Sequence, residues 1–199
     1  MIKKSCKLAA TIIIVSSINC AVAWPHPSGP NGGSLVTKKE CREMRNQADS
    51  GVRISQVEKL RTASIPDYIS GGVMEYYTDA SFPFKNELKY AVNEWNEKLE
   101  GKVRIIESAE KNGQTVKITH LPGKKGSVMG TAYVNRKEIE IYLENNLYPS
   151  ATKGVIAHEI GHMLGLEHGC SETLMAGPRD NISYSVTALD AAAVLQDRF

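Results

Sequence analysis

The sequence predicts a single α+β domain, with α/β-like character, in which helices pack on a twisted mixed sheet. Three observations predict it. The chain has 199 residues, enough for one ordinary domain with short extras. Hydrophobic residues make up 42% and charged residues 23%, as is typical of a soluble globular protein. Patterns typical of a strand, a helix, several strands and then helix follow one another along the chain, an order that indicates a mixed sheet.

The first 23 residues are typical of a signal peptide. Three lysines near the start are followed by an apolar stretch over residues 8–18, and Ala21 and Ala23 form a small-x-small cleavage site. The stretch is too short to span a bilayer, and no later segment reaches that length. A lipoprotein start at Cys20 is the alternative, but the three residues before it match that motif poorly. We therefore expect a secreted protein with no membrane span.

Removal of residues 1–23 changes the net charge. The segment carries three lysines and no acidic residue, so the formal charge falls from +2 to −1. The remaining chain has no basic stripe, which excludes nucleic acid as an expected partner. We expect a monomer.

Residues 24–72 precede the recognisable part of the chain. Residues 24–34 contain three prolines and three glycines and predict an irregular tether. Residues 37–48 are charged and compatible with a helix, and the Pro and Gly residues within 64–72 break the pattern. This segment is either an N-terminal extension or a propeptide.

The elements of residues 73–143 follow from their periodicity. Val73–Thr78 is a β-branched and aromatic run, hence a strand. Residues 84–99 have apolar side chains at helical spacing and predict a helix that packs on a sheet, with Gly101 as a stop signal. Further strands are expected at residues 103–107 and 115–120, with a turn at Asn112 and Gly113, and at residues 131–134 and 138–143, as two exposed-edge strands.

A third helix carries the most informative pattern, HEIGHMLGLEH, over residues 158–168. His158 and His162 are four residues apart, so both imidazoles lie on one face of a helix and can reach the same Zn²⁺. Glu159 points to the side of that face, beside the metal, where a general base has to lie.

Gly165 explains how a third histidine joins the other two. Ten residues of continuous helix rise about 15 Å, which would carry His168 away from the metal. Gly165 can adopt a positive φ and turn the chain, so that His168 returns to complete the ligand set. Three histidines and one open position indicate a catalytic zinc site. The alternative is a helix with ordinary surface or core histidines.

This motif resembles the one that defines the metzincin metalloproteases, and the resemblance covers residues 73–199. It implies a catalytic domain with a twisted mixed sheet, an active-site helix and a small C-terminal helical subdomain. Residues 171–176 look like the family's Met-turn, which implies that Met175 lies beneath the zinc histidines; the alternative is an ordinary core methionine. Thr187 and Asp190 fit a capping box that opens a last helix over residues 188–198, expected to pack on the active-site helix.

Within the family, the C-terminal part looks most like matrixins, with snapalysins as second choice. Snapalysins have an aspartate as third ligand, and His168 favours matrixins. Matrixins also tend to hold calcium and a second zinc. Only His26 and His120 remain outside the motif, so one zinc is expected; calcium stays possible but no motif supports it.

Cys41 and Cys170 are the cysteines that remain after signal removal. In an oxidising compartment such a pair usually forms a disulfide. The alternative is that Cys41 caps the zinc in a latent form, but its flanking residues do not resemble the known latency motif. The disulfide is therefore our expectation.

The expected function is that of a secreted zinc-dependent endopeptidase, acting on protein or peptide substrates through a zinc-activated water with Glu159 as general base. The resemblance implies that the substrate lies extended along an edge strand. Two other hypotheses are a zinc-stabilised binding module without catalysis and a structural protein with a fortuitous motif. The presence of Glu159 argues against a binding module, which needs no base.

Overall fold

The computed structural model describes residues 36–123, 128–144, 148–177 and 180–199. The expected signal peptide, residues 1–23, and the expected tether, residues 24–34, lie outside this part of the chain. Among the helices of the described residues, none is both long and apolar enough to cross a membrane.

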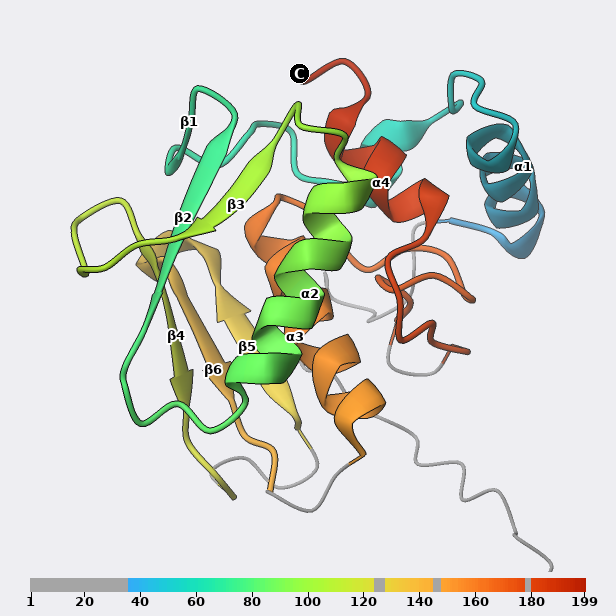
Figure 1. Cartoon of the computed structure of the whole chain (residues 1–199). Coiled ribbons are helices and arrows are strands. Elements are labelled where there is room, and N and C mark those ends of the chain that lie inside the picture. The colour runs from blue at the N-terminus through green and yellow to red at the C-terminus, as the bar shows by residue number, and fades with distance from the viewer. Residues whose placement is uncertain (1–35, 124–127, 145–147, 178–179) are drawn as a thin grey trace, which may run out of the picture.

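Six strands form one mixed sheet (Figure 1). In the sheet, β2 pairs in parallel with both β3 and β4, and β4 pairs in parallel with β6. The two antiparallel pairs are β1 with β2 and β5 with β6, and β5 ends the sheet. The strands are β1 (Ile69–Ser70), β2 (Val73–Thr78), β3 (Arg104–Glu107), β4 (Val116–His120), β5 (Gly130–Tyr133) and β6 (Glu138–Ile141).

The register of the strands brings their apolar side chains together. Met74 lies beside Ile105, and Ile118 lies beside Ile139, all of them buried. Because successive side chains of a strand point to opposite faces, this alignment gives the sheet one apolar face. That face is where a helix layer packs.

Two helices, α2 (Lys85–Lys98) and α3 (Pro149–Met163), pack against each other and against the sheet (Figure 1). The indole Nε1–H of Trp95 in α2 donates to the backbone oxygen of Ala157 in α3 at 2.9 Å, and Trp95 is fully buried. The α+β class, the mixed sheet and the helix on the sheet are therefore confirmed.

The N-terminal arm, which we define as residues 36–72, belongs to the same hydrophobic core as the rest of the chain. Its helix α1 (Lys38–Asp49) begins with a capping box between Thr37 and Glu40 and packs on α4 (Ala188–Leu195) (Figure 1). Two 3-10 turns complete the elements of the described residues, η1 (Val57–Leu60) in the arm and η2 (Val134–Arg136) between β5 and β6.

The two strands on either side of the expected turn at Asn112 and Gly113, β3 and β4, both pair with β2. One expectation about strand placement was wrong. The strand at 138–143 is not an exposed edge but lies between β4 and β5. Its alternating glutamates suggested solvent exposure, yet Glu140 is buried and accepts a hydrogen bond from the Tyr142 hydroxyl at 2.5 Å.

The last helix also differs from expectation. It begins after Thr187 with the expected capping box but ends at Leu195, three residues early. It packs chiefly on α1 rather than on the active-site helix. Asp190 in its first turn connects it to Leu174 and Met175.

Candidate metal centre

The geometry of the centre begins with the end of α3. Leu164 ends the helix and Gly165 follows with φ +83°. The N–H of Leu166 donates to Gly161 O at 3.0 Å and the N–H of Gly165 to His162 O at 3.0 Å, which is the double bond pattern of a Schellman motif. Gly165 thus reverses the chain, as its place in the sequence predicts.

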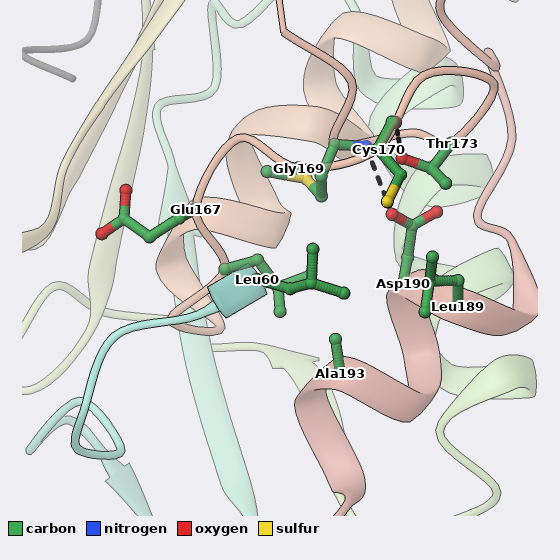
Figure 2. Close-up of a pocket in the computed structure, with 10 residues that line it drawn as sticks. Leu60, Glu167, Gly169, Cys170, Thr173, Leu189, Asp190 and Ala193 are labelled. Carbon is green, nitrogen blue, oxygen red and sulfur yellow. Dashed lines mark hydrogen bonds between the residues drawn. The ribbon is translucent and has the colours of Figure 1, made fainter. Parts of the chain in front are cut away.

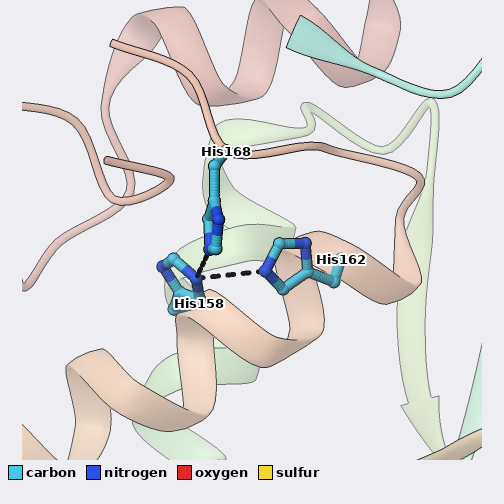
Figure 3. Close-up of side chains that lie close together, drawn as sticks. All are labelled: His158, His162 and His168. Carbon is cyan, nitrogen blue, oxygen red and sulfur yellow. Dashed lines mark hydrogen bonds between the residues drawn. The ribbon is translucent and has the colours of Figure 1, made fainter. Parts of the chain in front are cut away.

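This reversal brings the three histidines of the motif together (Figure 3). His162 Nε2 lies 3.1 Å from His158 Nε2, and His158 Nε2 lies 3.2 Å from His168 Nε2. The three rings converge from α3 and from the loop that follows it, with their candidate ligand atoms within 4.8 Å of one another. His158 is fully buried, whereas His168 is half-buried and borders the surface.

Backbone carbonyls orient two of the imidazoles. His158 Nδ1 lies 2.7 Å from Leu174 O, and His162 Nδ1 lies 2.8 Å from Leu166 O. Because a carbonyl oxygen only accepts, Nδ1 carries the hydrogen in both rings and Nε2 keeps its lone pair. Such outer hydrogen bonds typically fix the tautomer and orientation of metal-binding histidines.

The spacing of these nitrogens fits zinc. Two nitrogens that each lie about 2.0–2.1 Å from a tetrahedral Zn²⁺ are about 3.3 Å apart. The two Nε2–Nε2 distances, 3.1 and 3.2 Å, are close to this value. Lone pairs that face one another at such a distance repel, and a cation between them turns the repulsion into coordination. His158, His162 and His168 are therefore able to hold one zinc ion.

Glu159 lies next to His158 on α3 and is fully buried. A Cβ built on Gly130 would lie 2.9 Å from Glu159 Oε1, so the carboxylate occupies the space beside the first residue of β5. The carboxylate thus lies between the histidine helix and the strand that ends the sheet.

Met175 packs against α3 at Gly161. A Cβ at Gly161 would overlap Met175 Sδ, so the glycine between the two helix histidines makes room for the thioether. Asp190 of α4 holds this turn, because its carboxylate accepts the backbone N–H of Leu174 at 3.0 Å and of Met175 at 3.2 Å. Burial raises the pKa of Asp190, while hydrogen bonds from Thr187 and these amides lower it.

A disulfide joins Cys41 of α1 to Cys170, with a Cα–Cα distance of 5.3 Å. Both cysteines are buried. Cys170 lies two residues after His168, so the bond attaches the N-terminal arm to the loop that carries this histidine.

Two residues contribute to the centre in ways that their sequence pattern does not reveal. Asp190 was expected only as a helix cap, although it also binds the turn around Met175. Gly130 carried no signal, because a glycine at the start of a strand has many local explanations. Only the three-dimensional contact with Glu159 gives it a role.

Part of the chain matches a known protein family, and the chain is also similar to solved structures. Residues 74–169, which run from β2 to just past His168, match the family described as metallo-peptidase family M12B, reprolysin-like. No curated protein matches the chain. Among solved structures, myroilysin is 11% identical, with 68% of this chain and 99% of that chain covered and a TM-score of 0.47. A zinc-dependent peptidase from Methanocorpusculum labreanum is 15% identical, with 62% and 100% covered and a TM-score of 0.40.

The family match thus covers β3 to β6, nearly all of β2, the histidine helix and all three converging imidazoles in one continuous segment. A metallopeptidase domain with a three-histidine group fits the long motif read from the sequence. On these grounds the protein is a zinc metallopeptidase.

Proposed function

We propose that this protein is a secreted endopeptidase in which His158, His162 and His168 bind one catalytic Zn²⁺ and Glu159 is the general base. The convergence of the three Nε2 atoms, two of them oriented by carbonyls, carries the proposal. Three protein ligands leave one tetrahedral position for water or substrate, as in catalytic rather than structural zinc sites.

The chemistry follows from what each residue does. Bound zinc supplies Lewis acidity, which polarises the scissile carbonyl and lowers the pKa of water to about 7. Glu159 accepts a proton from the attacking water and delivers it to the leaving nitrogen as the C–N bond breaks. One peptide bond and one water become a carboxyl and an amine. Glu159 is fully buried, and its carboxylate lies beside Gly130 at the start of β5.

Substrate binding is proposed at β5. As the last strand of the sheet, β5 has one edge that pairs with no other described strand, and an extended peptide can add to such an edge through backbone hydrogen bonds. This strand begins at Gly130, beside Glu159, so a peptide on it would pass the proposed base. Protein or peptide chains are the corresponding substrates.

Within the metallopeptidases, we propose that this protein is a matrixin-like metzincin. His168 supports it over a snapalysin, and Gly177, two residues after Met175, leaves no tyrosine at the position where astacin-type members have an extra ligand. Residues 1–23 support secretion as a cleaved signal peptide, and the buried disulfide fits an oxidising compartment.

The test is Glu159→Gln in the purified mature protein, with cleavage of a peptide library followed by mass spectrometry. The variant should keep one zinc per chain and lose about 10²–10⁴-fold in kcat. Glu97→Gln, on the exposed side of α2, is the matched control and should retain parental turnover. Cleavage by Glu159→Gln at the parental rate would remove Glu159 from the mechanism. Zinc binding by the parent without any cleavage would instead favour the zinc-stabilised binding module.

A further inference from the structure

We propose that the N-terminal arm positions the third zinc ligand, with Leu60 and Tyr68 as positioning residues, and is therefore a permanent part of the active enzyme. The inference rests on the zinc site proposed above. It concerns the ligand loop, which we define as residues 164–172 and which carries His168 between the end of α3 and the turn around Met175.

The arm pairs with the ligand loop through its backbone. Arg61 and Leu166 form an antiparallel bridge. On one side of it the N–H of Thr62 donates to Gly165 O at 2.9 Å, and on the other the N–H of Glu167 donates to Leu60 O at 2.9 Å. Three residues of the arm thus act as a short extra strand along the loop. The bond from Glu167 to Leu60 is made one residue before His168.

The start of the loop is held by a side chain of the arm. The hydroxyl of Tyr68 donates to the backbone oxygen of Met163, the last residue of α3, at 2.8 Å. Tyr68 is buried, and burial raises the pKa of its hydroxyl, which stays a donor. The point at which the chain leaves the helix is therefore fixed from the arm.

Leu60 supports the loop just beyond His168. A Cβ built on Gly169 would lie 2.7 Å from Leu60 Cδ2, so the leucine packs directly on the glycine backbone. Figure 2 shows Leu60 reaching between Gly169 and Cys170 of the loop and Ala193 of α4. The cavity that remains there has a volume of about 10 Å³, room for about one water molecule.

The far end of the loop is held by α1. Cys41 forms the disulfide with Cys170, and Arg45 donates to Ser171 O at 3.0 Å and pairs with the Glu172 carboxylate. The loop is thus attached to the arm on both sides of His168. Because His158 and His162 lie on a packed helix, the position of His168 is the one that depends on these contacts.

The decisive experiment compares Leu60→Ala with Ile54→Ala in the full mature protein. Both substitutions remove the same number of carbons from a buried side chain of the arm. The backbone of Ile54, however, is bound by the Gln196 side chain just after α4 rather than by the ligand loop. Zinc affinity is measured by competition with a chromophoric chelator. Coordination geometry is read from the visible spectrum of the cobalt-substituted proteins.

Both variants should unfold at a lower temperature than the parent. Only Leu60→Ala should bind zinc about 10- to 100-fold more weakly, the usual cost of losing support for a ligand, and only its cobalt spectrum should change. Equal zinc affinity and equal spectra in the two variants would overturn the inference, since Leu60 would then be ordinary core.

Tyr68→Phe provides a second test if Leu60→Ala does not fold. It removes only the hydroxyl that bonds Met163 O, and Tyr76→Phe in β2, another buried tyrosine, is its control. Weaker zinc binding in Tyr68→Phe alone supports the inference, and unchanged binding contradicts it. A parent that binds no zinc would refute the proposed function itself. If the parent binds zinc and the variants bind it with the same affinity, only the role of the arm would be refuted.

Discussion

Asp190 Oδ1 accepts the backbone N–H of Met175 at 3.2 Å, so the first turn of α4 fixes the turn that packs under the histidine helix. The other oxygen accepts the N–H of Leu174, the residue whose carbonyl receives the Nδ1–H of His158. One buried carboxylate is therefore connected to an imidazole of the metal centre through a single peptide unit.

Asp190→Asn should destabilise the protein. An amide has one acceptor oxygen instead of two, so buried donors of this turn lose a partner, at a cost of about 1–3 kcal/mol in the free energy of unfolding. Urea denaturation measures the change. Asp67→Asn, whose side chain is 82% exposed, is the control and should stay within about 0.5 kcal/mol of the parent. Equal stability of Asp190→Asn and the parent would contradict this role.

Gly130→Ala should impair catalysis without loss of zinc. The added Cβ would lie 2.9 Å from both Cγ and Oε1 of Glu159, so the carboxylate has to move. Misplacement of a reacting group by about 1 Å can reduce kcat by about 10²-fold. Steady-state cleavage and zinc content measure the two effects. In Gly113→Ala, the control, the new Cβ meets nothing within 4 Å, and kcat should not change. A parental kcat for Gly130→Ala would show that Glu159 is elsewhere when it acts.

Glu40 should make stability depend on acid pH. The Lys59 ammonium, and then the amide and hydroxyl of Thr37, lower the pKa of Glu40 from 4.5 to about 2. A pKa that is lower in the folded state stabilises the fold above about pH 4.5, and this contribution is lost as the pH falls towards 2. Between these values the melting temperature of the parent should fall more steeply than that of Glu40→Gln. Glu43→Gln, three residues after Glu40 on the same helix, is the control and should follow the parent. Parallel curves for Glu40→Gln and the parent would refute the linkage.

The Cys41–Cys170 bond should contribute substantially to stability. It spans a sequence separation of 129 residues, and closing a loop of this size is worth about 4–5 kcal/mol in the chain-entropy treatment. Replacing both cysteines by alanine should lower the free energy of unfolding by an amount of this order, measured in guanidinium chloride. In the denatured but unreduced parent, alkylation should label neither cysteine. Labelling of both would show free thiols and would favour the alternative in which Cys41 caps the zinc in a latent form.

Local signals account for what could be predicted from the sequence. Gly165 produced the reversal after α3 because the helix end depends on a few neighbouring residues. The capping boxes at Thr37 and Thr187 are determined in the same way, by residues three positions apart. The strand Val73–Thr78 was found with its bounds because its composition contrasts with the glycines before it.

The rest depends on contacts between distant parts of the chain. The strand β4 pairs with β2, which lies more than 30 residues earlier in the chain, and the local pattern of the turn before β4 does not encode this pairing. Gly130 lies 29 positions before Glu159, and Leu60 lies 109 positions before Gly169, so no periodicity links them. The polar pattern of β6 was misleading because Glu140 is buried and accepts a hydrogen bond from Tyr142, the residue directly after the strand.

The pairing of Leu60 and Thr62 with the ligand loop has a consequence for biosynthesis. The arm emerges from the ribosome long before the segment it holds, and the extra strand has no partner until residues 165–167 follow. Contacts of such long sequence separation form late in folding. A nascent chain therefore cannot assemble a complete three-histidine centre before residues 165–168 have been synthesised and have met the arm.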